Sequence, residues 1–387
     1  MPMYDANDMV ELKNRKKRKK RLMRLTAILI VSAGAAGAYF TSDMWLPKLR
    51  GLGRQYTTIV NDGKLAEGNF PIEINGGAQY QVSCTDDTVI VLSDAYIYFY
   101  NEDGGQLAKR QHAYTNAVMR SENGRALIYE SGGYDLSVED RTGLLYKKNE
   151  ERLILFARLS ADGYVAAVTD SEDYECEITV YDRSGAVVYQ RMCMERVNDI
   201  SFTKDSKGCV ISYISAENGS LVTSVQEVVF TESDDKWTSR GLETLGLNVY
   251  GFDSGAFLLG IDACGYVDGS GNISSFYRYT GELAGGASSG GKSAVIINSD
   301  DRRKYVMAMF DGAGEPYIIN FDTPLTDVKV SGGLAYVMTQ DSVLAYDFSG
   351  ALRSTAQIND SYIGFERSDN YVFLESFSKI DRINYES

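Results

Sequence analysis

Short apolar runs separated by polar turns dominate the pattern of hydrophobic positions along the chain. There are eight runs of four to six residues: Val89–Leu92, Ala126–Tyr129, Tyr164–Val168, Gly208–Tyr213, Ala256–Leu259, Ala294–Ile297, Leu334–Met338 and Tyr371–Leu374. Apolar runs of this length, bounded by turn residues, predict buried inner β-strands rather than helices. No long window after residue 45 spaces its apolar residues three and four apart, so we predict an all-β fold for this region.

A strand–turn–strand motif, seen clearly in Thr179–Gln190, recurs along the chain. The turn glycines are Gly104, Gly143, Gly185, Gly271, Gly314 and Gly350, separated by 39, 42, 86, 43 and 36 residues. The interval of 86 fits two units of 43, and Glu227–Asp235 holds the missing copy, whose turn lacks glycine. A period of about 40 residues with several short strands is typical of a β-propeller blade.

The eight runs predict an eight-bladed β-propeller over residues 70–387. A seven-bladed propeller is the alternative, if the irregular fourth copy merges with a neighbour. The eighth copy reaches only its third strand, Ser378–Tyr385, whereas residues 70–74 form a strand that precedes the first copy. Pro71 restricts that strand to a sheet edge. We therefore expect residues 70–74 to pair with the last blade and close the ring.

The region before the propeller divides into three segments. Residues 1–24 form a basic tail, residues 25–42 contain no charged side chain, and residues 43–69 read as a linker. An apolar helix of eighteen residues is about 27 Å long, close to the thickness of the bilayer core. The basic flank places the tail in the cytoplasm and the propeller outside the cell membrane, as a single-pass anchor. Cleavage as a signal peptide after Ala36-Gly-Ala38 is the alternative.

The charge distribution limits the partners of the folded region. The chain carries a net charge of −14, but residues 1–24 hold nine Lys/Arg and three acids, so the rest carries 30 basic and 50 acidic groups. A folded region with a charge of −20 lacks the basic surface that nucleic acid requires. We expect the lipid bilayer, through residues 25–42, and an envelope protein or polysaccharide as partners, and no nucleic acid.

The turn sequences Tyr181-Asp-Arg-Ser-Gly185 and Tyr346-Asp-Phe-Ser-Gly350 follow apolar strands at a short interval. This unit resembles the repeat of quinoprotein-like and WD40-like propellers. Together with the basic tail and the single span, it resembles an uncharacterised family of membrane-anchored propellers of Gram-positive bacteria. That resemblance implies an architecture and no established activity.

Two sequence features resemble chemical motifs without their expected context. Gly286–Ser293 matches the phosphate-loop pattern, but a short strand follows it where the motif needs a helix, so we interpret it as a Gly/Ser loop between blades. His112 is the only histidine, and we interpret it as a surface residue in a connection between blades. The chain has only two tryptophans, Trp45 and Trp237, where a quinoprotein enzyme would carry one docking motif in most blades. We therefore predict no catalytic, cofactor or metal site.

Acidic pairs and cysteines are the remaining candidate metal-binding residues. The pairs Asp86-Asp87, Glu172-Asp173, Asp234-Asp235 and Asp300-Asp301 lack the spacing of a calcium loop and are interpreted as solvated turns. The five cysteines are Cys84, Cys176, Cys193, Cys209 and Cys264, and they show no metal-binding spacing. We expect free buried thiols, with a disulfide from Cys193 to Cys176 or Cys209 as the alternative.

These observations favour a non-catalytic scaffold or recognition module on the outer face of the membrane. Abundant tyrosine suits a contact surface, since 27 tyrosines are present. The first alternative is a hydrolase or lyase that uses carboxylates around the central channel. The second is a sensor that transmits ligand binding through the span to the basic tail.

Overall fold

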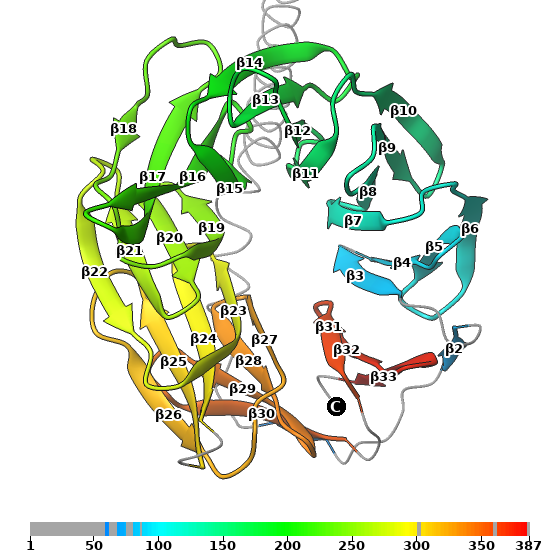
Figure 1. The fold of residues 1–387 in the computed structure, drawn as a ribbon. Coiled ribbons are helices and arrows are strands. Elements are labelled where there is room, and N and C mark those ends of the chain that lie inside the picture. The colour runs from blue at the N-terminus through cyan, green and yellow to red at the C-terminus, as the bar shows by residue number, and fades with distance from the viewer. Residues whose placement is uncertain are drawn as a thin grey trace, which may run out of the picture. The chain divides into compact units, whose positions relative to one another are not determined.

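Each apolar run lies in a sheet of four antiparallel strands, one of which gains a fifth, parallel strand, and the eight sheets form a ring (Figure 1). The structure is a computed structural model, and it describes residues 59–61, 68–74, 80–85, 87–299, 303–358 and 362–384. The chain divides into two units, Met1–Thr57 and Thr58–Ser387, and every described residue lies in the second. The predicted basic tail and the predicted span at residues 25–42 lie outside the described residues. Within those residues, no helix has the length and apolar character to cross a membrane.

The sheets follow one another along the chain as blades 1 to 8. Blade 1 contains β3 (Gln81–Thr85), β4 (Thr88–Leu92), β5 (Tyr96–Asn101) and β6 (Gln106–Gln111). Blade 2 contains β7 (Ala117–Glu122), β8 (Arg125–Glu130), β9 (Asp135–Asp140) and β10 (Gly143–Asn149). Blade 3 contains β11 (Ile154–Leu159), β12 (Val165–Thr169), β13 (Cys176–Tyr181) and β14 (Val187–Cys193). Blade 4 contains β15 (Arg196–Phe202), β16 (Gly208–Glu217), β17 (Ser220–Val229) and the short β18 (Trp237–Thr238).

The second half of the ring repeats this arrangement. Blade 5 contains β19 (Gly246–Phe252), β20 (Gly255–Gly260), β21 (Ala263–Asp268) and β22 (Ile273–Arg278). Blade 6 contains β23 (Glu282–Ser289), β24 (Lys292–Ser299), β25 (Lys304–Asp311) and β26 (Tyr317–Phe321). Blade 7 contains β27 (Asp327–Ser331), β28 (Leu334–Met338), β29 (Ser342–Asp347) and β30 (Leu352–Gln357). Blade 8 contains β31 (Gly364–Arg367), β32 (Tyr371–Glu375), β33 (Lys379–Asn384) and β2 (Ile72–Glu73). The prediction of eight blades is confirmed, and the irregular fourth copy is a separate blade.

The apolar runs form the second strand of each blade rather than the innermost one. In blade 1, all five residues of β4 are buried, whereas the innermost strand β3 is half-buried throughout. The innermost strand borders the channel, so polar residues are tolerated there. Strand β4 is covered by strands on both edges and by neighbouring blades on both faces, so it consists almost entirely of apolar residues.

One hydrophobic cluster fills each interface between neighbouring blades. The cluster between blades 3 and 4, for example, joins Ile178 of β13 to Ile211 of β16. Seven clusters connect consecutive blades in this way. The eighth brings Phe373 of blade 8 against Val89 and Val91 of blade 1. The ring is therefore closed by the same kind of packing that joins its other blades.

The strand expected to close the ring has the expected partner. Strand β2 pairs antiparallel with β33, with Ile72 opposite Ile380 and Glu73 opposite Lys379. The next residue, Ile74, donates its backbone N–H to the carbonyl oxygen of Ser378 at 2.8 Å. The outer strand of the last blade thus comes from the residues that precede the first blade.

Arg382 on β33 adds a polar contact to this closure. Its side chain is 1% exposed, and its Nη1 donates to the carbonyl oxygen of Glu102 and to Asp103 Oδ1 at 2.9 Å. The guanidinium lies 4.0 Å from the ring centre of Tyr371 and 5.0 Å from that of Phe70. One cation thus joins the last blade, the closing segment and a turn of the first blade.

Blade 7 has a fifth strand that the sequence pattern did not predict. Strand β1 (Ile59–Asn61) lies within the predicted linker 43–69 and pairs parallel with β30, with Ile59 opposite Ser354. Three residues without an alternating pattern are too short to stand out from a linker. The pairing covers part of an outer edge that would otherwise present unpaired backbone groups.

The recurring Asp-x-Ser-Gly motif stabilises the turn between the third and fourth strands of a blade. Oδ1 of Asp182 accepts the backbone N–H groups of Ser184 at 2.8 Å and Ala186 at 2.9 Å. The hydrogen bonds from the Ser184 hydroxyl and from these N–H groups lower the pKa of Asp182 below its usual range. Gly185 has a φ of +82°, which a residue with a side chain rarely adopts. The motif therefore reflects turn geometry and carries no binding function of its own.

Candidate functional site

The innermost strands of neighbouring blades are joined by polar side chains along the channel. Gln81 of β3 accepts the backbone N–H of Met119 on β7 at 2.9 Å. In the same way, Asp199 of β15 accepts from Val249 at 2.9 Å, and Asp327 of β27 accepts from Phe365 at 3.2 Å. The carboxylates of Asp199 and Asp327 therefore have a structural role, because they replace backbone pairing between blades that share no ladder.

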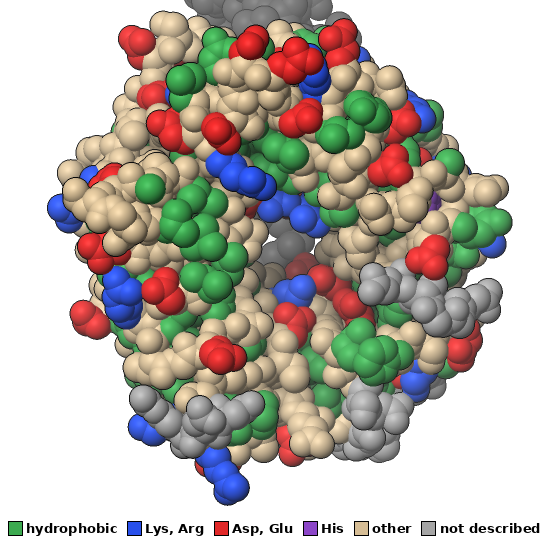
Figure 2. Space-filling view, in the orientation of Figure 1, with side chains coloured by type: hydrophobic (Ala, Val, Ile, Leu, Met, Phe, Trp, Pro, Cys, Tyr) green, Lys and Arg blue, Asp and Glu red, His purple; other side chains and the backbone are tan. Residues whose placement is uncertain are grey.

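A cluster of acids and one lysine occupies the channel wall at blades 7 and 8. Lys329 Nζ pairs with Glu366 at 2.8 Å. Two further carboxyl groups lie near Gly364, where a Cβ built on the glycine would be 3.5 Å from Asp327 Oδ2 and 3.8 Å from Glu375 Oε2. Figure 2 shows acidic side chains on this wall of the central hollow, near β27 and β31, and basic side chains on the opposite wall, near β11 and β15.

Burial raises the pKa of each carboxyl group in this cluster. Burial and the charge of Glu366 raise the pKa of Glu375 to about 8, so Glu375 is protonated at neutral pH. Burial also raises the pKa values of Asp327 and Glu366, although Lys329 opposes both shifts. Burial disfavours the charged form of Lys329, but the neighbouring carboxylates outweigh this and raise its pKa. Acid–base catalysis by two carboxyl groups needs one group with a raised pKa and one whose pKa stays low, whereas the pKa values of all three carboxyl groups in this cluster are raised.

The two faces of the ring differ in their exposed side chains. Strands within a blade are antiparallel, so loops from the second to the third strand and loops between blades share one face, called here the connection face. Hairpins between the first and second and between the third and fourth strands form the opposite, turn face. Among the described residues, eighteen large apolar side chains are exposed, and six lie in loops of the connection face: Tyr134, Tyr174, Met194, Ile261, Ile363 and Phe377.

The other twelve of these side chains lie on strands, nine of them on the outermost strand of a blade, and none lies in a hairpin of the turn face. On the connection face, Phe377 is 75% exposed and Met194 is 73% exposed. Phe377 and Ile363 border a groove of about 650 Å³ between blades 8, 1 and 2, with Tyr80 and Leu92 in its wall. Exposed aromatic and aliphatic groups beside a groove that also offers polar side chains are usual features of a contact surface.

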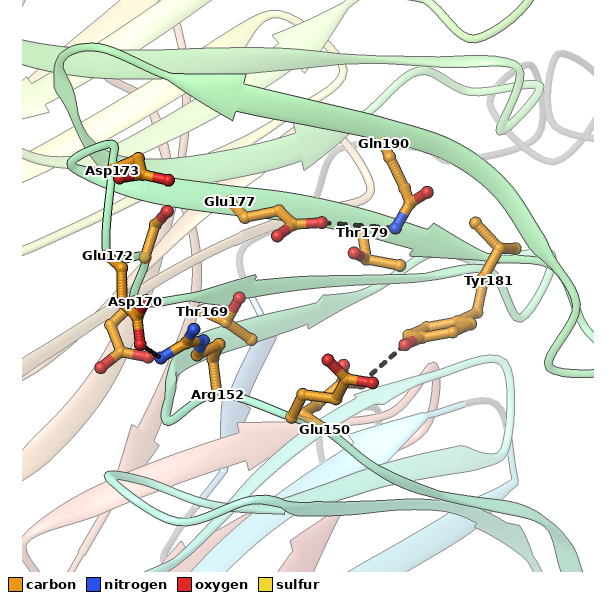
Figure 3. Close-up of a pocket in the computed structure, with 13 residues that line it drawn as sticks. Glu150, Arg152, Thr169, Asp170, Glu172, Asp173, Glu177, Thr179, Tyr181 and Gln190 are labelled. Atoms are coloured by element: carbon orange, nitrogen blue, oxygen red, sulfur yellow. Dashed lines mark hydrogen bonds and ion pairs between the residues drawn. The ribbon is translucent and has the colours of Figure 1, made fainter.

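A second groove, between blades 2 and 3, is strongly acidic (Figure 3). Its volume is about 410 Å³, and Glu150 in its wall accepts a hydrogen bond from the Tyr181 hydroxyl at 2.7 Å. Arg152 lies at the rim and pairs with Glu172 at 2.6 Å. The figure shows the acidic side chains spread along the groove rather than converging on one point. Within the described residues, no group of three or more His, Cys, Asp or Glu side chains is arranged to hold a metal ion.

The phosphate-loop match proves to be a hairpin within blade 6. Its first four residues belong to β23, Gly290 and Gly291 form the turn with positive φ, and Lys292 begins β24. Lys292 pairs with Asp311, and the hydroxyl of Tyr266 lies 2.7 Å from Ser293 Oγ. The prediction of a loop between blades was wrong about its place, because Gly286–Ser289 continue the sheet as an inner strand.

His112 is buried, so the prediction of a surface residue was wrong. Its side chain is 9% exposed and stacks on Tyr114 at 5.8 Å between ring centres. Its Nε2 lies 2.8 Å from the carbonyl oxygen of Ser93. The polar neighbours Gln111 and Tyr114 concealed this, because a connection between blades folds back against its own blade.

The acidic pairs and the cysteines have separate positions around the ring. Asp87 is exposed in a hairpin, Glu172 and Asp173 line the acidic groove, and Asp235 pairs with Arg191 at 2.5 Å. Asp86, Asp300 and Asp301 lie outside the described residues. None of the five cysteines is in a disulfide, and all but the half-buried Cys84 are buried.

Comparisons with known proteins place the chain within a family and a fold. Residues 66–384 match the family of unknown function DUF5711, so the chain belongs to that family. None of the curated proteins matches the sequence. Among solved structures, BamB from Moraxella catarrhalis has 16% identity and a TM-score of 0.51, over 81% of this chain and 100% of BamB.

Two further structures show the same architecture. The computationally designed protein Ika8 has 11% identity and a TM-score of 0.62, over 81% of this chain and 98% of its own. Sqt1 from Saccharomyces cerevisiae has 8% identity and a TM-score of 0.54, over 86% and 100%. Identities this low establish the β-propeller fold alone.

Proposed function

We propose that this propeller is a non-catalytic recognition module that binds an envelope protein or a cell-wall polymer through its connection face. The observation that carries the proposal is that, among the described residues, six large apolar side chains are exposed in loops of that face and none in the hairpins of the turn face. Exposing such groups to water is unfavourable, and the propeller does not need them there for its own packing. A partner that covers these side chains removes their apolar surface from water, and this burial favours binding.

The proposal includes attachment to the cell membrane by residues 25–42, with residues 1–24 in the cytoplasm. It rests on the apolar length of that segment and its basic flank. In this arrangement the propeller lies outside the cell membrane, so its partner is also extracytoplasmic. Protease treatment of intact cells should remove the propeller and leave the tail protected.

Cross-linking of the full chain in its own cells tests the proposal. Phe377→Ser combined with Ile363→Ser removes two apolar groups from the connection face. Tyr317→Ser combined with Ile318→Ser is the matched control, because it removes similar exposed groups from the outer strand β26. We expect a specific cross-linked partner with the wild type and the control, and its loss with the first variant. Equal cross-linking by all three chains would contradict binding at this face.

The carboxyl cluster of the channel supports a second candidate, a carboxylate-based hydrolase or lyase. Glu375 has the raised pKa of a general acid, and Asp327 lies on the same side of Gly364. This is the weaker candidate for two reasons. The pKa values of all three carboxyl groups are raised, so none is left as the base, and Asp327 already accepts structural hydrogen bonds. Turnover of an envelope polymer by the wild type, abolished in Glu375→Gln, would favour it.

A further inference from the structure

Two buried cysteines lie opposite each other on the third and outermost strands of blade 3. Cys176 begins β13 and Cys193 ends β14, and the two residues are paired in the antiparallel ladder between these strands (Figure 1). Residues paired in this way have Cα atoms about 4.5–5.5 Å apart, and a disulfide spans about 4.4–6.8 Å between the same atoms. The backbone of blade 3 therefore holds the two cysteines at a separation that a disulfide can bridge.

The contacts of the two thiol groups support this pairing. A hydrogen bond between the thiols lowers the pKa of Cys176 below that of an ordinary cysteine. The same contact and burial raise the pKa of Cys193. The contacts of the sulfurs to backbone oxygens are long, 3.9 Å from Cys176 Sγ to Glu195 and 3.9 Å from Cys193 Sγ to Arg191. A bond between the two sulfurs would therefore replace only weak contacts to the backbone.

Cys209 is a less suitable partner for Cys193, although it packs in the same hydrophobic cluster. It lies on β16 of blade 4, where its paired residues are Phe202 and Val228. Sheets that pack face to face lie about 10 Å apart, whereas cysteines whose Cα atoms are more than about 7 Å apart cannot be bridged without backbone movement. The two alternatives that the sequence left open for Cys193 therefore differ, and the ladder of blade 3 favours Cys176.

The pair lies where a small local opening would expose it. Cys176 and Cys193 are 0% and 2% exposed, but they are the last pair of their ladder, at the connection face. The next residue, Met194, is 73% exposed, and β14 is the outermost strand of its sheet. The end of an outer strand separates from its sheet at a much lower free energy than global unfolding requires. A reagent can therefore reach these thiols from the folded state.

We propose that Cys176 and Cys193 are a reversible redox pair, which a low-molecular-weight disulfide oxidises to an intrachain disulfide between β13 and β14. The Cys176 thiolate attacks one sulfur of the reagent, forms a mixed disulfide and releases one reagent thiol. Cys193 then loses its proton and attacks the Cys176 sulfur, which releases the second reagent thiol. The protein loses two electrons and two protons, and the reagent gains them as two thiols.

Oxidation has a structural consequence for the connection face. The disulfide joins the end of the outer strand β14 to the strand beside it, so it prevents the local opening that exposes the pair. It also restricts the unfolded chain, because it closes a loop between residues 176 and 193. The reaction needs no partner protein or polymer, so it does not rest on the recognition function proposed above.

Peptide mass spectrometry of the full chain in detergent tests the pair. The protein is incubated with oxidised glutathione, the remaining thiols are alkylated, and trypsin digestion follows without reduction. Trypsin cleaves after Arg and Lys, so the three cysteines of the cluster fall in three different peptides. We expect the peptides Leu159–Arg183 and Met192–Arg196 to be joined by a disulfide and to be separated by dithiothreitol.

Thermal unfolding gives a second readout. The oxidised wild type should melt at least about 3 °C above the reduced protein. Cys193→Ala cannot form the bond and should melt at the same temperature in both buffers. Cys209→Ala, which also removes a buried thiol of this cluster, is the matched control and should keep the difference.

Four outcomes would each overturn the proposal. These are the absence of the joined peptides in the oxidised wild type, a disulfide from Cys193 to Cys209 in their place, equal melting temperatures of the oxidised and reduced wild type, and an oxidation-dependent shift that persists in Cys193→Ala. The two peptide outcomes are measured on the wild type, so they decide the matter even if an alanine variant does not fold.

Discussion

Closure of the ring by β2 leads to a quantitative prediction. Ile72 and Ile74 are 5% and 9% exposed, and both pack in the cluster that joins blade 8 to blade 1. Replacing a buried isoleucine by alanine costs about 2–5 kcal/mol. Because β2 is a short outer strand that relaxes more easily than a central one, we take the low end, about 2–3 kcal/mol for each residue. The double variant Ile72→Ala/Ile74→Ala should lose about 5 kcal/mol, a large part of a typical stability of 5–15 kcal/mol.

Urea denaturation followed by tyrosine and tryptophan fluorescence measures this loss as a lower midpoint. Ile318→Ala is the matched control, since Ile318 is 39% exposed on the outer strand β26 and should cost less than about 0.5 kcal/mol. A loss below about 1 kcal/mol in the double variant would refute the reasoning, because it would mean that the ring is held closed without β2.

Three further predictions follow from single groups. Arg382→Met should cost about 2–4 kcal/mol in urea, because it removes the hydrogen bond to Asp103 and the stacking on Tyr371; a midpoint equal to that of Arg183→Met would contradict this. Glu375 has a folded pKa raised to about 8, above its usual 4.5, so the folded state holds its proton more tightly and loses stability as the pH rises from about 4.5 to 8. Glu375→Gln should therefore be more stable than the wild type at pH 8, by on the order of 2 kcal/mol, with little difference at pH 4; melting curves at both values check this, and a constant difference would count against it. A maleimide reagent should label Cys84 well before the four buried cysteines, as peptide mass spectrometry would show; early labelling of Cys264 would contradict the burial described.

The sequence predicted the parts of the fold that depend on local composition. The apolar runs predicted buried strands. The turn glycines predicted hairpins, because the turn uses both the hydrogen bonds to Asp182 and the positive φ of Gly185. The closing strand followed from counting strands in the last copy. These features depend on a few consecutive residues, so they are visible without knowledge of their partners.

The contacts around the channel could not be predicted in the same way. Arg158 and Asp199 are 41 residues apart, and Asp199 and Val249 are 50 apart. These separations differ because the blades differ in turn length and because bulges shift the register, as between Val197 and Asp199. The repeat period gives only the average length of a blade. It therefore does not predict which residues of adjacent innermost strands contact each other. Arg382 was missed for the same reason, since its partners are about 280 residues away.

The geometry of the repeat explains why we place the proposed binding surface on the connection face. The turn face is built from hairpins whose shape requires Asp, Ser, Gly and Asn, as Asp268 and Asp347 repeat the hydrogen bonds of Asp182. Residues of these types are fixed by turn geometry and leave little room for others. Among the described residues, three loops of the connection face are closed instead by a hydroxyl that accepts a backbone N–H, from Ser93, Thr339 and Ser376. These turns specify a Ser or Thr and not the exposed apolar residues of that face. Among the described residues, the fold exposes six large apolar groups in loops where turn geometry does not require them and none in the hairpins of the turn face, and this asymmetry supports the proposal that the connection face binds the partner.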